Sequence, residues 1–170
     1  MNQIKKNLEG LFIGFAVLTL IMLYGNVAFS QQLIVVALTT LGMYYLLSGA
    51  LVLFDKRVER VMRILYFVGL WSLSFGMLGL VFRLRFWANA ENVLMTGFAF
   101  GAVVFLVAVM YRQTTPKDKR QWVIEQLSPL IKRLAIYPLV FIGFFLWPTE
   151  SLYRTFGEFR YHEPYVQKLL

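Results

Sequence analysis

The sequence has 170 residues, of which 59% are hydrophobic and 15% are charged, and its net charge is +8. Soluble domains carry roughly 25% charged residues, so this composition and a mean hydropathy of +0.63 exclude a water-soluble globular protein. The chain contains no cysteine, which excludes disulfides, thiolate metal sites and cysteine nucleophiles.

Five apolar segments without Asp, Glu, Lys, Arg or His define the predicted fold. They cover residues 11–29, 33–54, 64–82, 93–111 and 134–147. The first four have about the 20 residues that a helix needs to cross the hydrocarbon core of a bilayer. The sequence therefore predicts an all-α integral membrane helical bundle. Because the segments carry no charge, it also predicts no ion or proton site within the membrane.

The first four segments form two predicted hairpins, which together make a transmembrane unit of residues 1–114. Twelve Lys and Arg residues precede the first segment or connect the second to the third and the fourth to the fifth. The turn between the third and fourth segments holds Arg83 and Arg85, and the turn after the first holds no charge. Basic residues accumulate on the cytoplasmic side, so we expect a cytoplasmic N-terminus, in a bacterial cytoplasmic (inner) membrane.

After the fourth segment the chain is no longer continuously apolar, and it divides into three predicted parts. Residues 115–133 read as an amphipathic cytoplasmic connection at the inner membrane surface that bends at Pro129. Residues 134–147 follow as a short fifth segment of about 21 Å. The bundle then has five helices, or four plus one re-entrant or interfacial helix. Residues 148–170 form an aromatic and charged tail that suits either the membrane interface or a partner.

Small residues four apart indicate where helices pack closely in lipid. Three helices carry such pairs, and we expect them to form helix-packing contacts inside the chain or with a partner: Gly10 and Gly14, Ser72 and Gly76, and Gly97 and Gly101.

One face of the second segment is polar, because Thr40, Tyr44 and Ser48 lie four residues apart. These side chains suit hydrogen bonds between helices. The alternative is a polar path for a transported molecule, with Arg83 and Arg85 at its outer mouth.

Residues suited to catalysis or metal binding are sparse. The single histidine, His162, has Glu158 four residues before it, which is too little for a metal site. Asp55 and Glu59 are also four apart, but basic residues surround them. We predict no catalytic residue, no metal and no cofactor, and this scarcity favours a non-enzyme over an enzyme.

These observations favour a noncatalytic multi-pass membrane protein that acts as a structural or accessory subunit of a larger complex or as a homo-oligomer. A small oligomeric transporter or channel is the alternative, and a membrane-embedded enzyme acting on lipid through Asp55 and Glu59 is a second one. The expected partners are the lipid bilayer and other membrane subunits or further copies of the chain. Nucleic acid is not expected, because the basic residues lie at segment ends.

Overall fold

The structure, a computed structural model, describes residues 2–24, 29–85 and 87–146. Side chains are described within these ranges except at 2–6, 24, 31 and 138–145. The predicted tail at 148–170, including His162 and Glu158, lies outside the described residues.

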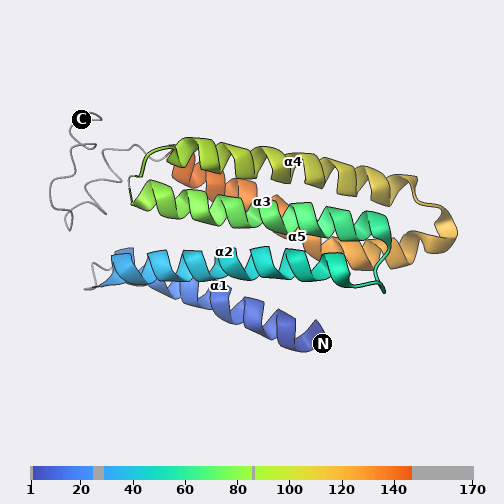
Figure 1. Ribbon diagram of the computed structural model, residues 1–170, viewed down its shortest axis with the longest axis horizontal. Helices are drawn as coiled ribbons and strands as arrows, with labels where there is room; N and C mark the ends of the chain where they lie inside the picture. The colour runs from blue at the N-terminus through green and yellow to red at the C-terminus, as the bar shows by residue number, and fades with distance from the viewer. Residues whose placement is uncertain (1, 25–28, 86, 147–170) are drawn as a thin grey trace.

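The described chain is an all-helical bundle without strands, which confirms the predicted fold class (Figure 1). Five helices follow one another: α1 Asn2–Tyr24, α2 Ser30–Phe54, α3 Arg60–Leu84, α4 Ala90–Thr114 and α5 Lys117–Leu146. Helices satisfy their backbone hydrogen bonds internally, which apolar surroundings require. Phe29 and Asn89 adopt left-handed φ angles of 64° and 63° immediately before α2 and α4. These residues turn the chain sharply into the next helix.

Three of these helices are long and apolar enough to cross a membrane: Gln32–Phe54, Arg60–Leu84 and Ala90–Thr114. In α1 the apolar stretch whose side chains the structure describes covers Asn7–Leu23, and residues 25–28 of the predicted first segment lie outside the described residues. In α5 the charged residues Lys132 and Arg133 lie in the middle of the helix.

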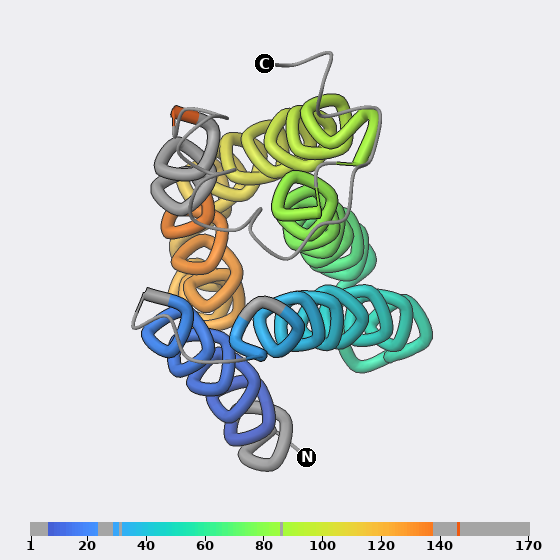
Figure 2. The backbone as a smooth tube through the Cα atoms, turned by 90° about the vertical axis from the view of Figure 1, so that its left-hand side faces the viewer, coloured from blue at the N-terminus to red at the C-terminus, as the bar shows by residue number. Residues whose placement is uncertain are grey.

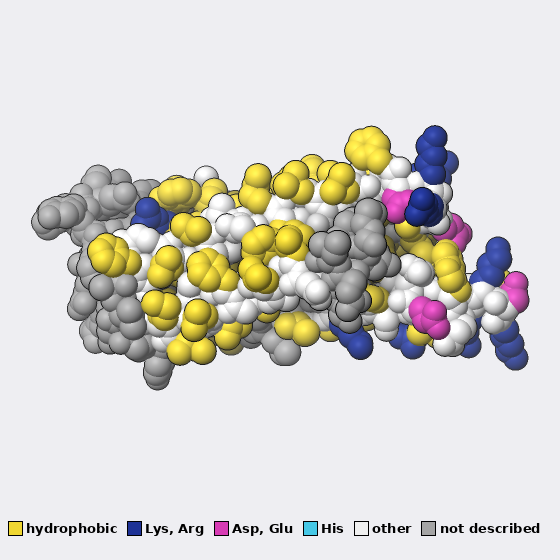
Figure 3. Space-filling view, turned by 90° about the horizontal axis from the view of Figure 1, so that it is seen from below, with side chains coloured by type: hydrophobic (Ala, Val, Ile, Leu, Met, Phe, Trp, Pro, Cys, Tyr) yellow, Lys and Arg dark blue, Asp and Glu magenta, His cyan; other side chains and the backbone are white. Residues whose placement is uncertain are grey.

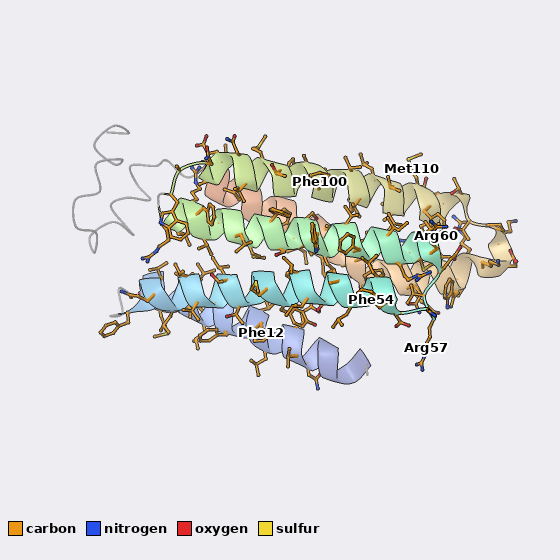
Figure 4. All side chains as sticks on the ribbon, in the orientation of Figure 1. Phe12, Phe54, Arg57, Arg60, Phe100 and Met110 are labelled. Atoms are coloured by element: carbon orange, nitrogen blue, oxygen red, sulfur yellow. The ribbon has the colours of Figure 1, made fainter. Side chains whose placement is uncertain are left out.

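The outer surface of the bundle suits lipid along most of its length (Figure 3). Hydrophobic side chains cover the middle of the visible face, and most of the visible charges gather at one end. On α4, Phe100 and Met110 point away from the other helices and are 54% and 63% exposed (Figure 4). The α2–α3 turn, near the labelled Phe54 and Arg57, lies at the end where α4 passes into α5.

Helix α3 lies between α2 and α4, with which it makes its most extensive contacts, and it also contacts α5 (Figure 2). The main core cluster joins α2, α3, α4 and α5, and includes Met62, Leu127 and Leu130, all fully buried. A second cluster at the other end joins α1, α2, α3 and α4 around Ile34, Leu80 and Leu94. By contrast, α1 packs mainly against α2.

Helix α5 is continuous where the sequence suggested two segments. It runs through Pro129 and covers both the expected surface connection at 115–133 and the expected fifth segment at 134–147. Its apolar residues Val123, Leu127 and Leu130 are buried in the bundle.

A proline inside a helix removes one hydrogen bond and disturbs the carbonyls of the preceding turn. Here Pro129 lies on the exposed side, and the Tyr66 hydroxyl of α3 donates to the carbonyl of Gln126. This contact joins α3 and α5 in the turn before the proline, while the carbonyl that loses its intrahelical donor is that of Glu125.

Candidate functional site

An acidic and a basic side chain meet inside the bundle. Arg133 of α5 donates from Nη2 to Glu9 Oε2 of α1, and Tyr45 of α2 donates to Glu9 Oε1 at 3.2 Å. The side chain of Glu9 is 8% exposed and that of Arg133 is 29% exposed. We call these three residues the Glu9 cluster. It joins the first and last described helices, 124 residues apart in the chain.

The Glu9 cluster lies within the apolar length of the bundle. Tyr45 is nine residues before Phe54, the last residue of a candidate span. At 1.5 Å per residue this places Tyr45 about 13 Å from the end of that span. Helix α1 begins at Asn2, so Glu9 lies two turns inside it.

Burying two charged groups is costly unless they are paired and their hydrogen-bonding atoms are satisfied. Both carboxylate oxygens of Glu9 accept a hydrogen bond, and its negative charge is balanced by Arg133. A buried pair of this kind adds little net stability, whereas removing one partner is strongly destabilising. An ionisable group at such a depth is by default a functional-site hypothesis.

An apolar cavity of about 220 Å³ begins at the Glu9 cluster and extends between α1, α2, α3 and α5. Tyr45 and Arg133 belong to both, and the surface of the cavity is almost wholly apolar, so the polar atoms of the Glu9 cluster lie beside it. Its lining residues recur at helical spacing on the inner faces of the four helices: Ile13, Ala16, Val17 and Leu20; Leu38, Leu41 and Tyr45; Leu73, Met77 and Leu80; Arg133, Ile136 and Tyr137.

The wall formed by α1 is attached on two sides. Helix α1 packs mainly against α2, where the rings of Phe12 and Tyr44 meet edge to face at 5.6 Å. On the α5 side, the ion pair between Glu9 and Arg133 joins the two helices.

The small residues predicted to pack helices divide into two groups. A Cβ atom on Gly97 of α4 would lie 2.7 Å from the backbone nitrogen of Gly76 and 3.0 Å from the carbonyl oxygen of Ser72. One on Gly101 would lie 3.2 Å from Ser72 Oγ, so these four residues meet at the α3–α4 interface.

In α1 the same spacing has no such partner. A Cβ atom on Gly10 or Gly14 would meet no heavy atom within 4 Å among the described residues.

Gly76 serves a second contact. A Cβ atom there would lie 1.5 Å from the hydroxyl oxygen of Tyr137, so the tyrosine side chain rests on the glycine backbone. Tyr137 lines the cavity, and Gly76 thereby fixes the position of one of its walls.

The residues of the predicted polar path do not come together. Thr40 is exposed and donates within its own helix to the carbonyl of Val36 at 2.7 Å. Tyr44 and Ser48 are half-buried, and neither lines the cavity. Arg83 is buried at the end of α3 beside Glu91, with Nη1 and Oε1 3.4 Å apart. Arg85 is exposed just beyond that helix.

The two acidic residues proposed for lipid chemistry are each engaged elsewhere. Asp55 accepts from the backbone nitrogen of Arg57 at 3.1 Å, and Glu59 accepts from the hydroxyl of Tyr111 at 3.1 Å. Across the part of the chain that the structure describes, His, Asp and Glu form no group of three that could hold a metal.

Sequence reasoning missed the Glu9 cluster because it assigned every charge to the ends of the apolar segments. Glu9 stands two residues before the first segment, and Arg133 directly precedes the fifth. Two features of the sequence could have indicated the pair. Glu9 and Arg133 have opposite charges, and each stands just before an apolar segment whose helix begins several residues earlier than the segment does. Which helices then face one another is a property of the fold.

No protein-family model, curated protein or solved structure matches the chain. Its class rests on its own residues: the part of the chain that the structure describes is a bundle of five helices, three of which are long and apolar enough to cross a membrane.

Proposed function

We propose that the chain is a noncatalytic multi-pass membrane protein that binds an amphiphilic molecule from the bilayer. The single observation that carries this proposal is an apolar cavity with the Glu9 cluster at one end. Binding sites for small molecules typically combine apolar walls with a few polar groups that orient the ligand. Here the apolar part of the ligand occupies the cavity, and its polar part lies against Tyr45 and Arg133.

Access to this site follows from the way α1 is attached. A molecule dissolved in the bilayer approaches the bundle from the side, between helices. The entrance that we propose lies between α1 and α5, because α1 packs mainly on α2. Opening it separates Glu9 from Arg133 for a short time, while the rest of the bundle stays closed.

The test fills the cavity without touching the ion pair. Ala16 is buried and lines the cavity, so Ala16→Leu places three additional carbons there. Ala135 is exposed on α5, and Ala135→Leu adds the same atoms outside. Each protein is placed in lipid nanodiscs, and binding of methyl octanoate, a short single-chain amphiphile, is measured.

We expect Ala16→Leu to reduce binding about tenfold or more, and Ala135→Leu to leave it unchanged, since the leucine competes for the same space. Equal binding by both variants would show that the cavity is not the site.

For the membrane orientation, we propose that the N-terminus and the basic connections lie in the cytoplasm of a bacterial cell. The support is the charge pattern of the connections, because basic residues accumulate on the cytoplasmic side. The chain has no cysteine, so a cysteine introduced by mutation is the only thiol that a labelling reagent can reach. With an impermeant thiol reagent on intact cells, Ala88→Cys is expected to react and Gln113→Cys is not. The opposite pattern would reverse the proposed topology.

A second candidate function, a subunit that assembles through α1, has its own support. Gly10 and Gly14 lie on a face of α1 that contacts no other described residue, and small residues four apart favour close helix pairing in lipid. The partner to which we commit is a second copy of the chain, because a two-fold axis brings both glycine pairs together. Oxidation is expected to cross-link Gly14→Cys between copies and to leave Phe100→Cys uncross-linked. No cross-linking at Gly14 would reject this candidate.

A further inference from the structure

Six basic side chains are exposed at one end of the bundle, where the α2–α3 turn lies beside the passage from α4 to α5 (Figure 4). The hydroxyl of Tyr111, near the end of α4, donates at 3.1 Å to Glu59, which directly precedes α3. This contact holds together two segments that are far apart in the chain. We call the six residues the basic end: Lys56, Arg57, Arg60, Lys117, Lys119 and Arg120.

The charge of the basic end is not balanced within the described part of the chain. Residues 55–60 and 117–120 contain six basic residues but only three acidic ones. Two of these acids, Asp55 and Glu59, already accept hydrogen bonds from a backbone nitrogen and from a tyrosine hydroxyl. None of the six basic side chains makes an ion pair with another described residue. The basic end therefore attracts an anion from outside the chain.

Large apolar side chains are exposed directly beside these charges. Phe54, which precedes the α2–α3 turn, is 81% exposed, and Trp122, two residues after Arg120, is 42% exposed. Basic and aromatic side chains exposed together are typical of the boundary between membrane and water, where the apolar groups face lipid and the charges reach the headgroups. This favours a lipid partner, because a polyanion dissolved in water would leave Phe54 and Trp122 against water.

We propose that the basic end binds the headgroups of anionic phospholipids at the membrane surface. Lysine and arginine donate charge-assisted hydrogen bonds to phosphate oxygens, and arginine can do so through two parallel N–H groups. Each basic residue near an anionic membrane surface strengthens the attraction about fivefold. The proposal goes beyond binding in the cavity, since none of the six residues lines it.

Two of the four tryptophans can report on the two ends of the bundle. Trp122 lies beside the basic end, and Trp87 lies in the turn between α3 and α4 at the other end; they are 42% and 48% exposed. Two forms of the full chain each keep one of them, with phenylalanine in place of the other three. In nanodiscs of phosphatidylcholine, fluorescence quenching is measured with phosphatidylglycerol or phosphatidylcholine that carries bromine at the same position of the same acyl chains.

We expect brominated phosphatidylglycerol to associate beside Trp122 about fivefold or more tightly than brominated phosphatidylcholine. Beside Trp87 the two lipids are expected to associate nearly equally. The preference at Trp122 should fall at high salt, because dissolved ions screen charges at an exposed surface. The cavity-filling change Ala16→Leu should leave it unchanged.

A charge-removal variant tests whether the six residues carry the preference. It combines Arg57→Gln, Arg60→Gln, Lys119→Gln and Arg120→Gln, all at exposed positions, and the control is Arg85→Gln at the other end. The combined variant is expected to lose the preference for phosphatidylglycerol, and the control to keep it. The comparison of the two ends in the chain that retains all its charges decides the question even where the combined variant does not fold.

Two results would overturn this inference. Equal quenching of Trp122 by the two lipids would exclude anionic phospholipid and point to a soluble polyanion as the partner. A preference that survives the removal of the four charges would show that the basic end does not carry it. Neither result affects the proposed binding function, which methyl octanoate and Ala16→Leu test separately.

Discussion

Two helix interfaces in this bundle are built on opposite principles. At the α3–α4 interface, Gly76 and Gly97 bring the two backbones into direct contact, with no room for even a methyl group. Between α1 and α5 lie a cavity and the paired side chains of Glu9 and Arg133. The first interface depends on shape and the second on charge.

The difference shows what each interface can do. Close backbone packing in an apolar environment gains dispersion contacts along the whole interface, and it allows little movement. An ion pair beside a cavity concentrates the polar interaction between α1 and α5 in one place, so separating Glu9 from Arg133 weakens the attachment of α1 on that side. We therefore regard the α3–α4 interface as the framework of the molecule and α1 as its movable wall.

The largest expected loss of stability follows from disrupting the α3–α4 interface. In Gly97→Leu, the new side chain must displace the backbone of Gly76 and Ser72, which cannot move aside as a flexible side chain would. We expect a loss of more than about 4 kcal/mol in the free energy of unfolding, measured by titration with denaturing detergent in mixed micelles.

The matched control is Gly14→Leu, the same substitution in the same small-residue spacing on α1. Nothing lies within 4 Å of its Cβ position, so its unfolding free energy should stay within about 1 kcal/mol of the unmodified chain. Similar losses in both variants would contradict the division into framework and movable wall.

A smaller loss of unfolding free energy is expected when the ion pair between α1 and α5 is broken. Glu9→Gln leaves the half-buried Arg133 guanidinium without its counter-ion, which should cost about 2 kcal/mol of unfolding free energy, less than for a fully buried charge. Adding Arg133→Gln removes the uncompensated charge. The double variant should therefore be more stable than either single variant, as a thermodynamic cycle over the four proteins would show. Additive losses would mean that the two groups do not act as a pair.

The same comparison explains how far the sequence predicts this protein. The lengths of the apolar segments predict the all-helical bundle, because only helices satisfy the backbone in such surroundings. They do not reveal that Gly97 is in contact and Gly14 is open, since both belong to the same pattern and the outcome depends on which face meets a neighbour.

Pro129 shows a second limit of the sequence. It suggested a bend and a boundary between two segments, and the structure has a single helix through both, with Tyr66 of α3 donating to the carbonyl of Gln126 in the turn before Pro129. The ion pair escaped prediction for a related reason. Two charges next to segment ends look solvated in sequence, and the packing of α1 against α2 and the continuity of α5 bring them together inside the bundle.

The smallest expected effect comes from removing a tyrosine hydroxyl that donates to a glutamate, which the chain offers at two places. Tyr45 donates to Glu9 at 3.2 Å in a buried setting, and Tyr111 donates to Glu59 at 3.1 Å in an exposed one. Tyr45→Phe leaves a buried carboxylate oxygen without a donor, so we expect a loss of about 1–2 kcal/mol in unfolding free energy. In Tyr111→Phe, water replaces the lost donor, and the loss should stay below about 0.5 kcal/mol.

Because both variants remove one hydroxyl from the same residue type at nearly the same distance, the difference between them measures what burial adds to the Glu9 cluster. Equal losses would mean that water reaches Glu9 as freely as it reaches Glu59. A larger loss for Tyr45→Phe would show that the carboxylate of Glu9 is dry. A dry carboxylate depends on Arg133 and Tyr45, rather than on water, for its hydrogen bonds and for the balance of its charge.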